Sequence, residues 1–415
     1  MATSTSLSHF LKSSAIFTIS GVLVNLLGYA FHIFAGRYLG PGSYSEITTV
    51  FAYVMLLSVP IMVVNFVIVS QSGSYSHGPA RAAFLSSLRN YFDTLARSYS
   101  LLAGLYSGLA LLGYLNHLSI ATALVMPAFV LTLIYAQLYP ILLQSAKRFI
   151  PLSFILLTAG FLKLAAALTA LWLPSAPLIL FLLALANLIQ VWLARRYLPA
   201  APINVTPFSP AQIIADPRLK LIFLSLLGII ALNNLDVVIA KQVLPAGMAG
   251  MYGVWSLFAK AITYSFLPLS SVALVFFTDR ESIHHSSRIL FYSIIFLSAT
   301  GITAYFAFRL LAELLVTKLM GPAFSPLSSL LPTAAVFGTL YSMIYLINNY
   351  YLSVNSKLAL LPTIVVPISM LVILFTNHSL SSFTATITLC GGLALLTYLL
   401  SILWRTTRTS VSPSH

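Results

Sequence analysis

Long apolar stretches divide the sequence, and this feature limits its fold more than any other. Hydrophobic residues make up 59% of the 415 residues and charged residues only 7%. A soluble domain carries roughly 25% charged residues, so a surface of this kind cannot face mainly water. The chain is therefore predicted to be an all-α polytopic membrane protein.

A membrane-spanning helix needs about 20 predominantly apolar residues, and about 12 stretches of the chain meet this need. We expect these helices at residues 14–36, 45–70, 98–116, 119–143, 150–172, 176–194, 219–240, 249–277, 288–310, 327–352, 358–376 and 381–404.

The basic residues predict how these helices face the two sides of the membrane. The net charge is +14, which in a soluble protein would suggest nucleic acid as a partner. Here most lysines and arginines lie in short loops on one side of the predicted spans, as the positive-inside rule describes. We therefore expect both termini in the cytoplasm and no nucleic-acid binding.

A weak internal repeat divides the chain into two halves. A shift of 208 residues, about half of 415, superposes four landmarks, namely Asn25 on Asn233, Gly42 on Gly250, Tyr44 on Tyr252, and Pro60 on Pro268. Six spans per half is an even number, so both halves enter the membrane from the same side, as a parallel repeat. This predicts two pseudo-symmetric six-helix bundles, 1–194 and 219–415, joined by a Pro-rich cytoplasmic linker, 195–218, around a central cavity with alternating access.

Three short motifs resemble those of a known family. The segment 36–44 reads Gly-Arg-Tyr-Leu-Gly-Pro-Gly-Ser-Tyr, and it resembles the segment after the first helix of polysaccharide-biosynthesis flippases. The segments 233–236 and 249–252 resemble the counterpart in the second half, and Gly-Pro-Ala-Phe at 321–324 is similar to an outer loop of that family. These flippases belong to the multidrug/oligosaccharidyl-lipid/polysaccharide exporter superfamily.

The resemblance implies an O-antigen-flippase-like protein in the plasma (inner) membrane of a prokaryote. Such a protein moves a polyprenyl-pyrophosphate-linked oligosaccharide from the cytoplasmic to the outer leaflet for cell-surface polysaccharide assembly. Its partners would be that lipid, the bilayer, a coupling ion (Na⁺ or H⁺) and other proteins of polysaccharide assembly. Arg37 lies in the first motif and Asp236 in the second, so the resemblance adds weight to both residues.

Ionisable residues within predicted spans are candidates for the site, because a mid-membrane Lys or Asp costs about 2.5–3.5 kcal/mol on insertion scales. Lys163 and Lys260 lie well inside two spans, one in each half. Two cations at this depth suit a cavity that holds an anion such as pyrophosphate. The alternative is that their long side chains extend to the membrane surface.

Asp236 is the acidic residue clearly inside a span. It either forms an ion pair, with Lys241 for example, or binds the coupling ion. Arg37 lies at the outer end of the first span, where it either contacts substrate or anchors the helix in the interface.

Polar and helix-breaking residues complete the set of candidates. Asn25 and Asn233 either line the cavity or form hydrogen bonds between helices. Pro60 and Pro268 are expected to kink their helices and to serve as hinges.

Motifs for catalysis and cofactors are absent from the sequence. It contains no P-loop and no His-Glu-x-x-His motif, and its one cysteine excludes a thiolate metal cluster. We therefore expect no cofactor, no metal and no enzymatic activity. The alternatives to a flippase are a cation-coupled small-molecule (multidrug) exporter and, with less support, a membrane glycan polymerase or ligase.

Overall fold

The structure, a computed structural model, describes residues 2–74, 79–146, 148–198, 217–278, 283–376 and 379–410. Every regular element in these ranges is a helix. Eight helices are long and apolar enough to cross a membrane, and there are up to 10 spans if each of two bent pairs counts as one. The prediction of an all-α polytopic membrane protein is confirmed.

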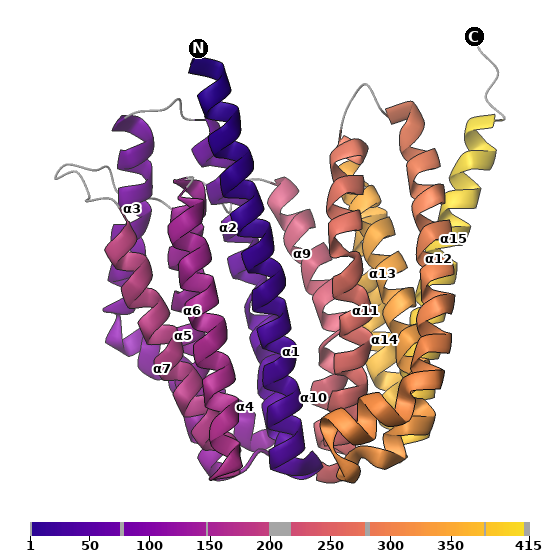
Figure 1. The fold of residues 1–415 in the computed structure, drawn as a ribbon. Helices are drawn as coiled ribbons and strands as arrows, with labels where there is room; N and C mark the ends of the chain where they lie inside the picture. Colours follow the sequence, from indigo (N-terminus) through magenta and orange to yellow (C-terminus); the bar gives the residue numbers. More distant parts are fainter. Residues whose placement is uncertain are drawn as a thin grey trace. The chain divides into compact units, whose positions relative to one another are not determined.

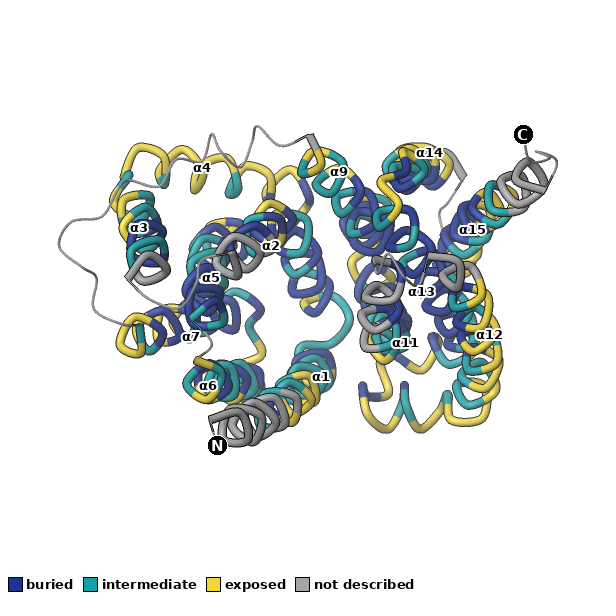
Figure 2. Tube along the Cα trace, turned by 90° about the horizontal axis from the view of Figure 1, so that it is seen from above, coloured by how far each residue is buried: buried dark blue, intermediate teal, exposed yellow. Residues whose placement is uncertain are grey.

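The first compact unit contains residues 1–39 and 57–216. Its helices are the first part of α1 (Ala2–Leu57), α2 (Val59–Ser74), α3 (Pro79–Ala96), α4 (Tyr99–Leu115), α5 (Ile120–Ser145), α6 (Phe149–Leu168) and α7 (Ala176–Tyr197). α5 contacts α2, α3, α4, α6 and α7, and Figure 2 shows much of it buried among them. α5 is therefore the central helix of unit 1.

The second compact unit contains residues 40–56 and 217–415. Its helices are the second part of α1 together with α9 (Pro217–Leu232), α10 (Leu235–Val243), α11 (Ala246–Thr278), α12 (Ile283–Glu313), α13 (Leu331–Ser353), α14 (Leu361–Thr376) and α15 (Leu380–Ser410). Short helical turns cover Leu314–Met320, Pro322–Leu330 and Lys357–Leu360. α13 contacts α11, α12 and α15 and forms the core of this unit (Figure 1).

α1 passes from one unit to the other at a kink. Gly40 has a φ of 71° and a ψ of 169°, a conformation that glycine adopts without the steric cost of a Cβ atom. Pro41 follows, and its missing N–H does no harm at the start of a new helical segment. A second break lies at Ser58, between α1 and α2, so the predicted span 45–70 is divided between two helices. Breaks in the helix thus lie close to both ends of the segment 40–56 that belongs to unit 2.

The third predicted span, 98–116, corresponds to α4 (Tyr99–Leu115). α3 precedes it outside the predicted spans, and the two helices together pass as one span bent by 64°. Leu85, Leu88 and Phe92 on α3 are buried in the core of unit 1. Their spacing places them on one side of a helix, and this side draws α3 into the bundle.

The predicted linker 195–218 lies mostly outside the described residues, since only 195–198 and 217–218 are described. The units divide between Asp216 and Pro217. The bundles 1–194 and 219–415 remain a prediction, and the compact units differ from them in the segment 40–56, which belongs to unit 2.

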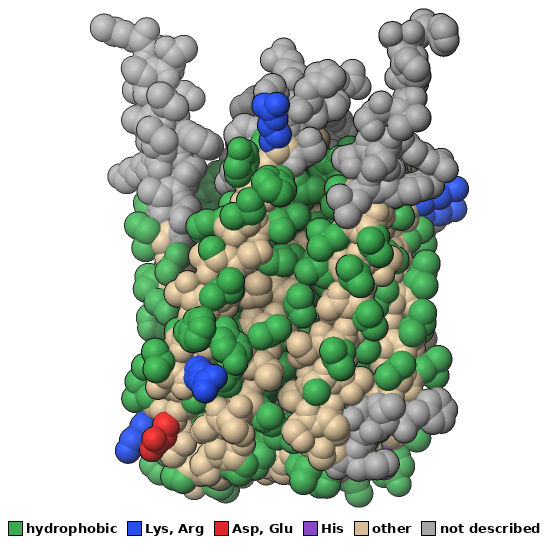
Figure 3. Space-filling view, turned by 90° about the vertical axis from the view of Figure 1, so that its right-hand side faces the viewer, with side chains coloured by type: hydrophobic (Ala, Val, Ile, Leu, Met, Phe, Trp, Pro, Cys, Tyr) green, Lys and Arg blue, Asp and Glu red, His purple; other side chains and the backbone are tan. Residues whose placement is uncertain are grey.

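One face of unit 2 has the character of a lipid-facing surface. Figure 3 shows it covered by hydrophobic side chains, with the visible charged groups toward its upper and lower ends. Exposed apolar residues on α12 and α15 include Phe291, Phe306, Leu310, Leu389 and Leu393. In water such a surface would be unfavourable, but lipid solvates it well.

Candidate functional site

A break between α9 and α10 forms the centre of the candidate site in unit 2. The two helices are bent by 42°, and Asn233 and Asn234 lie between them. The backbone N–H of Asn233 donates to the carbonyl of Ile230 at 3.3 Å, three residues back instead of four. Asparagine side chains compete for backbone hydrogen bonds and so favour such an interruption. Broken helices at membrane depth occur where protein buries them or where they line a cavity, and they form the binding sites of many transporters.

Side chains donate hydrogen bonds to two carbonyl groups at this break. Tyr341 Oη on α13 donates to the carbonyl of Ile229 at 3.0 Å. Asn234 Nδ2 donates at 2.8 Å to the carbonyl of Ile230, which also accepts the backbone N–H of Asn233. An unpaired carbonyl in a membrane interior costs several kcal/mol, so these two bonds hold the break in place.

Asp236 lies in the first turn of α10 and is completely buried. Tyr252 Oη donates a hydrogen bond to its Oδ2 atom. Its Oδ1 atom accepts no hydrogen bond from any described residue. The N-terminal end of a helix stabilises a carboxylate through the helix dipole. Tyr252 thus holds one oxygen of Asp236, and the other accepts no hydrogen bond from the described residues.

Lys260 on α11 points to the same break. Its Nζ atom donates to Asn234 Oδ1 at 3.0 Å, and its charge interacts with that of Asp236. The two charged groups do not form an ion pair within 4.0 Å, since the ion pairs of the described residues lie elsewhere. The structure thus brings Lys260 on α11 and Asp236 on α10 to one break, with Asn234 beside them.

The hypothesis that Asp236 pairs with Lys241 is wrong. Lys241 is buried and donates to Ser45 Oγ at 2.8 Å. Five residues separate Asp236 and Lys241 on α10, and at 3.6 residues per turn their directions differ by about 140°. The two side chains therefore leave the helix on different sides.

The repeated glycine segments pack against each other inside unit 2. A Cβ atom on Gly250 would overlap the backbone of Pro41, and one on Gly253 would overlap the side chain of Thr48. Close approach of helices requires residues without side chains at such points. Of the matched pair Gly42 and Gly250, Gly250 lies in such a contact, at the start of α11, whereas a Cβ atom on Gly42 would meet open space.

The predicted residues of unit 1 lie in different surroundings. Lys163 on α6 is half-buried, with its Nζ atom 4.7 Å from the centre of the Phe31 ring, a cation–π arrangement. Asn25 and Arg37 are exposed on α1, whereas Asn233 is buried at the α9–α10 break. The two repeat-related asparagines therefore share a place in the sequence without sharing an environment.

The predicted hinges lie on two different helices. Pro60 is the second residue of α2, directly after the break at Ser58, where its missing N–H lies in the first turn. Pro268 lies within α11, and its side chain is outside the described part of the structure. Their role as hinges remains a prediction.

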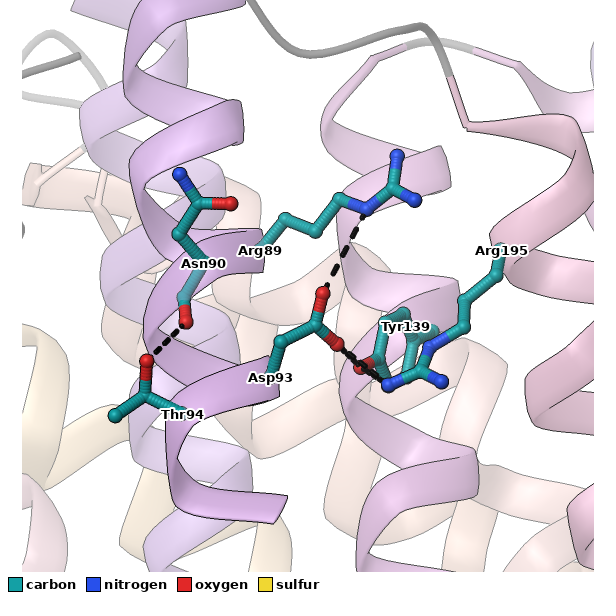
Figure 4. Close-up of polar contacts among 6 residues, drawn as sticks. All are labelled: Arg89, Asn90, Asp93, Thr94, Tyr139 and Arg195. Carbon is teal, nitrogen blue, oxygen red and sulfur yellow. Dashed lines mark hydrogen bonds and ion pairs between the residues drawn. The ribbon is translucent and has the colours of Figure 1, made fainter. Parts of the chain in front are cut away.

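A second polar cluster, in unit 1, ties α3, α5 and α7 together (Figure 4). Arg195 Nη2 lies 2.5 Å from Asp93 Oδ1 and 2.6 Å from Tyr139 Oη, and Tyr139 Oη donates to the same Asp93 oxygen. Arg89 adds a longer contact to Asp93 at 3.9 Å. Arg89 and Asp93 are four residues apart on one helix, whereas Tyr139 and Arg195 join them through tertiary contacts.

No group of three or more His, Cys, Asp or Glu side chains able to hold a metal occurs in the described ranges. Asn234 and Tyr341 are site residues to which sequence reasoning gave no role. The pair of asparagines in an apolar stretch was the available signal for Asn234. Tyr341 lies more than 100 residues from its partner and gave none.

Comparison with solved structures places the chain among known transporter folds. The lipid II flippase MurJ, in an inward closed conformation, matches with a TM-score of 0.67 at 14% identity, over 94% of this chain and 87% of that chain. An inward-facing multidrug resistance MATE family transporter of the MOP superfamily matches with a TM-score of 0.70 at 12% identity, over 94% and 96%. A MOP superfamily transporter from Pyrococcus furiosus gives a TM-score of 0.52 at 12% identity, over 97% and 96%.

No protein-family model and no curated protein matches the sequence. The likeness to solved structures establishes the fold alone. This chain shares that fold with transporters of the MOP superfamily over nearly its whole length. Membership of the O-antigen-flippase-like family remains a prediction.

Proposed function

We propose that the protein is a flippase that moves polyprenyl-pyrophosphate-linked oligosaccharide from the cytoplasmic to the outer leaflet. The observation that carries this proposal is Lys260, a cation held by Asn234 at the break between α9 and α10. Broken membrane helices form substrate and ion sites in transporters, and lysine binds phosphate as a point charge. One of the structural neighbours is a lipid II flippase.

The charges inside the membrane support an anionic substrate. Lys163 in unit 1 and Lys260 in unit 2 supply two positive charges within spans, and Asp236 supplies one negative charge. In the proposed mechanism the two lysines neutralise the pyrophosphate, and Asn25, Asn233 and Arg37 contact the sugars or the phosphate. The lipid tail stays in the bilayer.

Asp236 is proposed to couple transport to an ion gradient. Its Oδ1 atom is buried and accepts no hydrogen bond from the described residues, so it is suited to bind Na⁺ or to take a proton. The chain has no P-loop for ATP, and a gradient is the remaining common source of energy for a transporter of this fold. Alternating access, which the inward- and outward-facing structures of MATE neighbours illustrate, would then use Pro60 and Pro268 as hinges.

A cation-coupled multidrug exporter is the second candidate, and the TM-score of 0.70 to a MATE transporter favours it. A site for cationic drugs needs a surplus of negative charge, because charges of the same sign repel. The predicted site residues within the spans include two lysines and one aspartate, the opposite balance. A flippase is therefore the better-supported function.

The test is transport by variants that remove each lysine charge. Lys163→Ala and Lys260→Ala, expressed in cells at the wild-type level, should leave lipid-linked oligosaccharide on the cytoplasmic side and reduce its appearance outside at least tenfold. Lys357→Ala removes a charge from an exposed residue and should transport normally. Unchanged transport in both variants would remove the lysines from the site. Export of a cationic dye, without any movement of the lipid-linked sugar, would favour the multidrug function.

A further inference from the structure

Unit 1 contains a cavity of about 260 Å³ that none of the proposed roles uses. It lies between α1, α2, α5, α6 and α7. Four side chains with a carboxamide group line it, and we call it the amide pocket after Asn65, Gln137, Gln144 and Gln190. The remaining lining residues are apolar, and none of the lining residues is charged.

The bundle fixes two of these amides through bonds that only its tertiary structure creates. Pro140 has no N–H, so the carbonyl of Ala136, four residues earlier on α5, lacks its helical donor. Gln190 Nε2 on α7 donates to this carbonyl at 2.9 Å. Gln137 Nε2 donates to Ser58 Oγ at 3.2 Å, where the chain breaks between α1 and α2. Each of these amides uses one N–H in this way.

The other two amides differ, because no hydrogen bond joins them to another described side chain. Asn65 Oδ1 is buried and accepts no hydrogen bond from the described residues. A buried acceptor without a partner costs about 1–3 kcal/mol, so such a group calls for an explanation, for example a bound water, ion or ligand. Gln144 lies seven residues after Gln137, on the same side of α5, and it lines the same cavity.

These features indicate a neutral ligand that both donates and accepts hydrogen bonds. A carboxamide has two donors and a carbonyl acceptor, so it pairs with hydroxyl groups without a charge to balance. The apolar wall, which includes Phe17 and Met62, suits the C–H face of a sugar ring. Drug-sized ligands occupy pockets of roughly 300–1,000 Å³, so a cavity somewhat below this range suits one ring and not a whole oligosaccharide.

We propose that the amide pocket is a subsite for one uncharged sugar ring. The statement that this ring belongs to the transported head group rests on the proposed flippase function. The proposal that the pocket binds a sugar ring does not. The pyrophosphate would be held by lysines and the sugar by amides, so each part of the substrate would have its own binding groups. A sugar attached to the lipid and a free sugar share this chemistry, and the experiment separates them.

The test measures sugar binding to the full-length protein in lipid nanodiscs, so that no sugar-headed detergent competes. Glucose, galactose and N-acetylglucosamine are titrated one at a time, with calorimetry and the rise in Tm as readouts. At least one sugar should bind the wild type. Asn65→Leu and Gln144→Leu should each weaken this binding about three- to tenfold, the value of one lost hydrogen bond.

The variants are chosen so that loss of binding differs from loss of folding. No described residue uses Asn65 Oδ1, so Asn65→Leu should keep or raise the Tm without ligand. Gln190→Leu would remove the donor to the Ala136 carbonyl and is avoided. Asn90→Leu removes an exposed amide from α3 and should bind sugar like the wild type.

The results distinguish a lipid-linked sugar from a free sugar, and a sugar from a cation. If none of the three sugars binds, or if binding is unchanged in both Asn65→Leu and Gln144→Leu, the proposal is overturned. If sodium or tetraphenylphosphonium, and no sugar, raises the Tm in a way that depends on Asn65, the pocket is a cation site and the proposal is also overturned. Sugar binding without movement of lipid-linked oligosaccharide would keep the subsite, assign it to free sugars and refute only the flippase. Movement of the lipid without sugar binding would refute only the subsite.

Discussion

Removing the charge of Lys260 should destabilise unit 2 mainly through Asp236. Lys260→Met keeps the length of the side chain and removes the ammonium group near a completely buried carboxylate. The two groups are not within the 4.0 Å of an ion pair. At 4 Å, and with an effective dielectric constant of about 20, two unit charges attract by about 4 kcal/mol. The attraction between Lys260 and Asp236 is therefore smaller than this.

We expect Lys260→Met to lower the free energy of unfolding by about 1–3 kcal/mol, since it also removes the hydrogen bond to Asn234. For a unit of roughly 200 residues, 1 kcal/mol corresponds to about 2–4 °C in Tm. The Tm, followed by tryptophan fluorescence in nanodiscs, should fall by roughly 2–12 °C. Adding Asp236→Asn to this variant should restore at least about 1 kcal/mol, because the uncompensated charge is then gone.

The double-mutant cycle decides whether this reasoning holds. If the effects of Lys260→Met and Asp236→Asn simply add, the two groups do not interact and the site loses its central feature. Lys357→Met, at an exposed position, is the matched control and should leave the free energy of unfolding within about 0.5 kcal/mol of the wild type.

Three further substitutions test the packing of the two units. Gly250→Ala should lower the free energy of unfolding by about 2 kcal/mol or more, because its Cβ atom would overlap backbone. Gly247→Ala has open space around it and should raise this free energy by a few tenths of a kcal/mol. Thermal unfolding checks both. Tyr341→Phe should cost about 1–3 kcal/mol in the same assay, because it leaves a buried carbonyl at the α9–α10 break unpaired. Arg195→Leu should lower the free energy of unfolding by about 1 kcal/mol, because solvent screens a side chain that is 42% exposed. Adding Asp93→Asn to this variant should lower it little further.

Controls exist for each of these changes. Tyr99→Phe alters a tyrosine that is 79% exposed and should leave the Tm unchanged, as should Arg196→Leu at the exposed neighbour of Arg195. Equal effects of Gly250→Ala and Gly247→Ala would contradict the contact with Pro41. A Tyr341→Phe variant as stable as the wild type would mean that the carbonyl finds another donor.

The sequence singled out the two charged residues at the α9–α10 break but not the residues that contact them. Asp236 and Lys260 stand out because charge inside an apolar stretch is costly. Tyr252 donates to Asp236, Lys260 donates to Asn234, and Tyr341 donates to the backbone at the break. No local sequence pattern shows which tyrosine or asparagine faces a charge.

The amide pocket shows the same limit. Its four amides come from α2, α5 and α7, and each is unremarkable in its own helix. Pro140 leaves the Ala136 carbonyl without its helical donor, and the donor that replaces it, Gln190, lies on another helix. The mistaken pairing of Asp236 with Lys241 has a related origin, since closeness in the sequence does not decide the direction of a side chain on a helix.

By itself the sequence determined that the protein is a helical membrane protein. Its long apolar stretches indicate a bilayer, and in a bilayer the backbone polar groups must form their hydrogen bonds within each helix. It also left residues 37–44 between two predicted spans, and Gly40 and Pro41 break the helix there because their backbone preferences are local. Only the tertiary structure decided that the segment 40–56 belongs to unit 2 and that Lys260, Asn234 and Asp236 share one break. Such contacts depend on how helices distant in the sequence pack against one another. Lipid solvates an apolar helix face about as well as another helix does. The hydrophobic pattern that locates a helix therefore does not determine which helices are its neighbours.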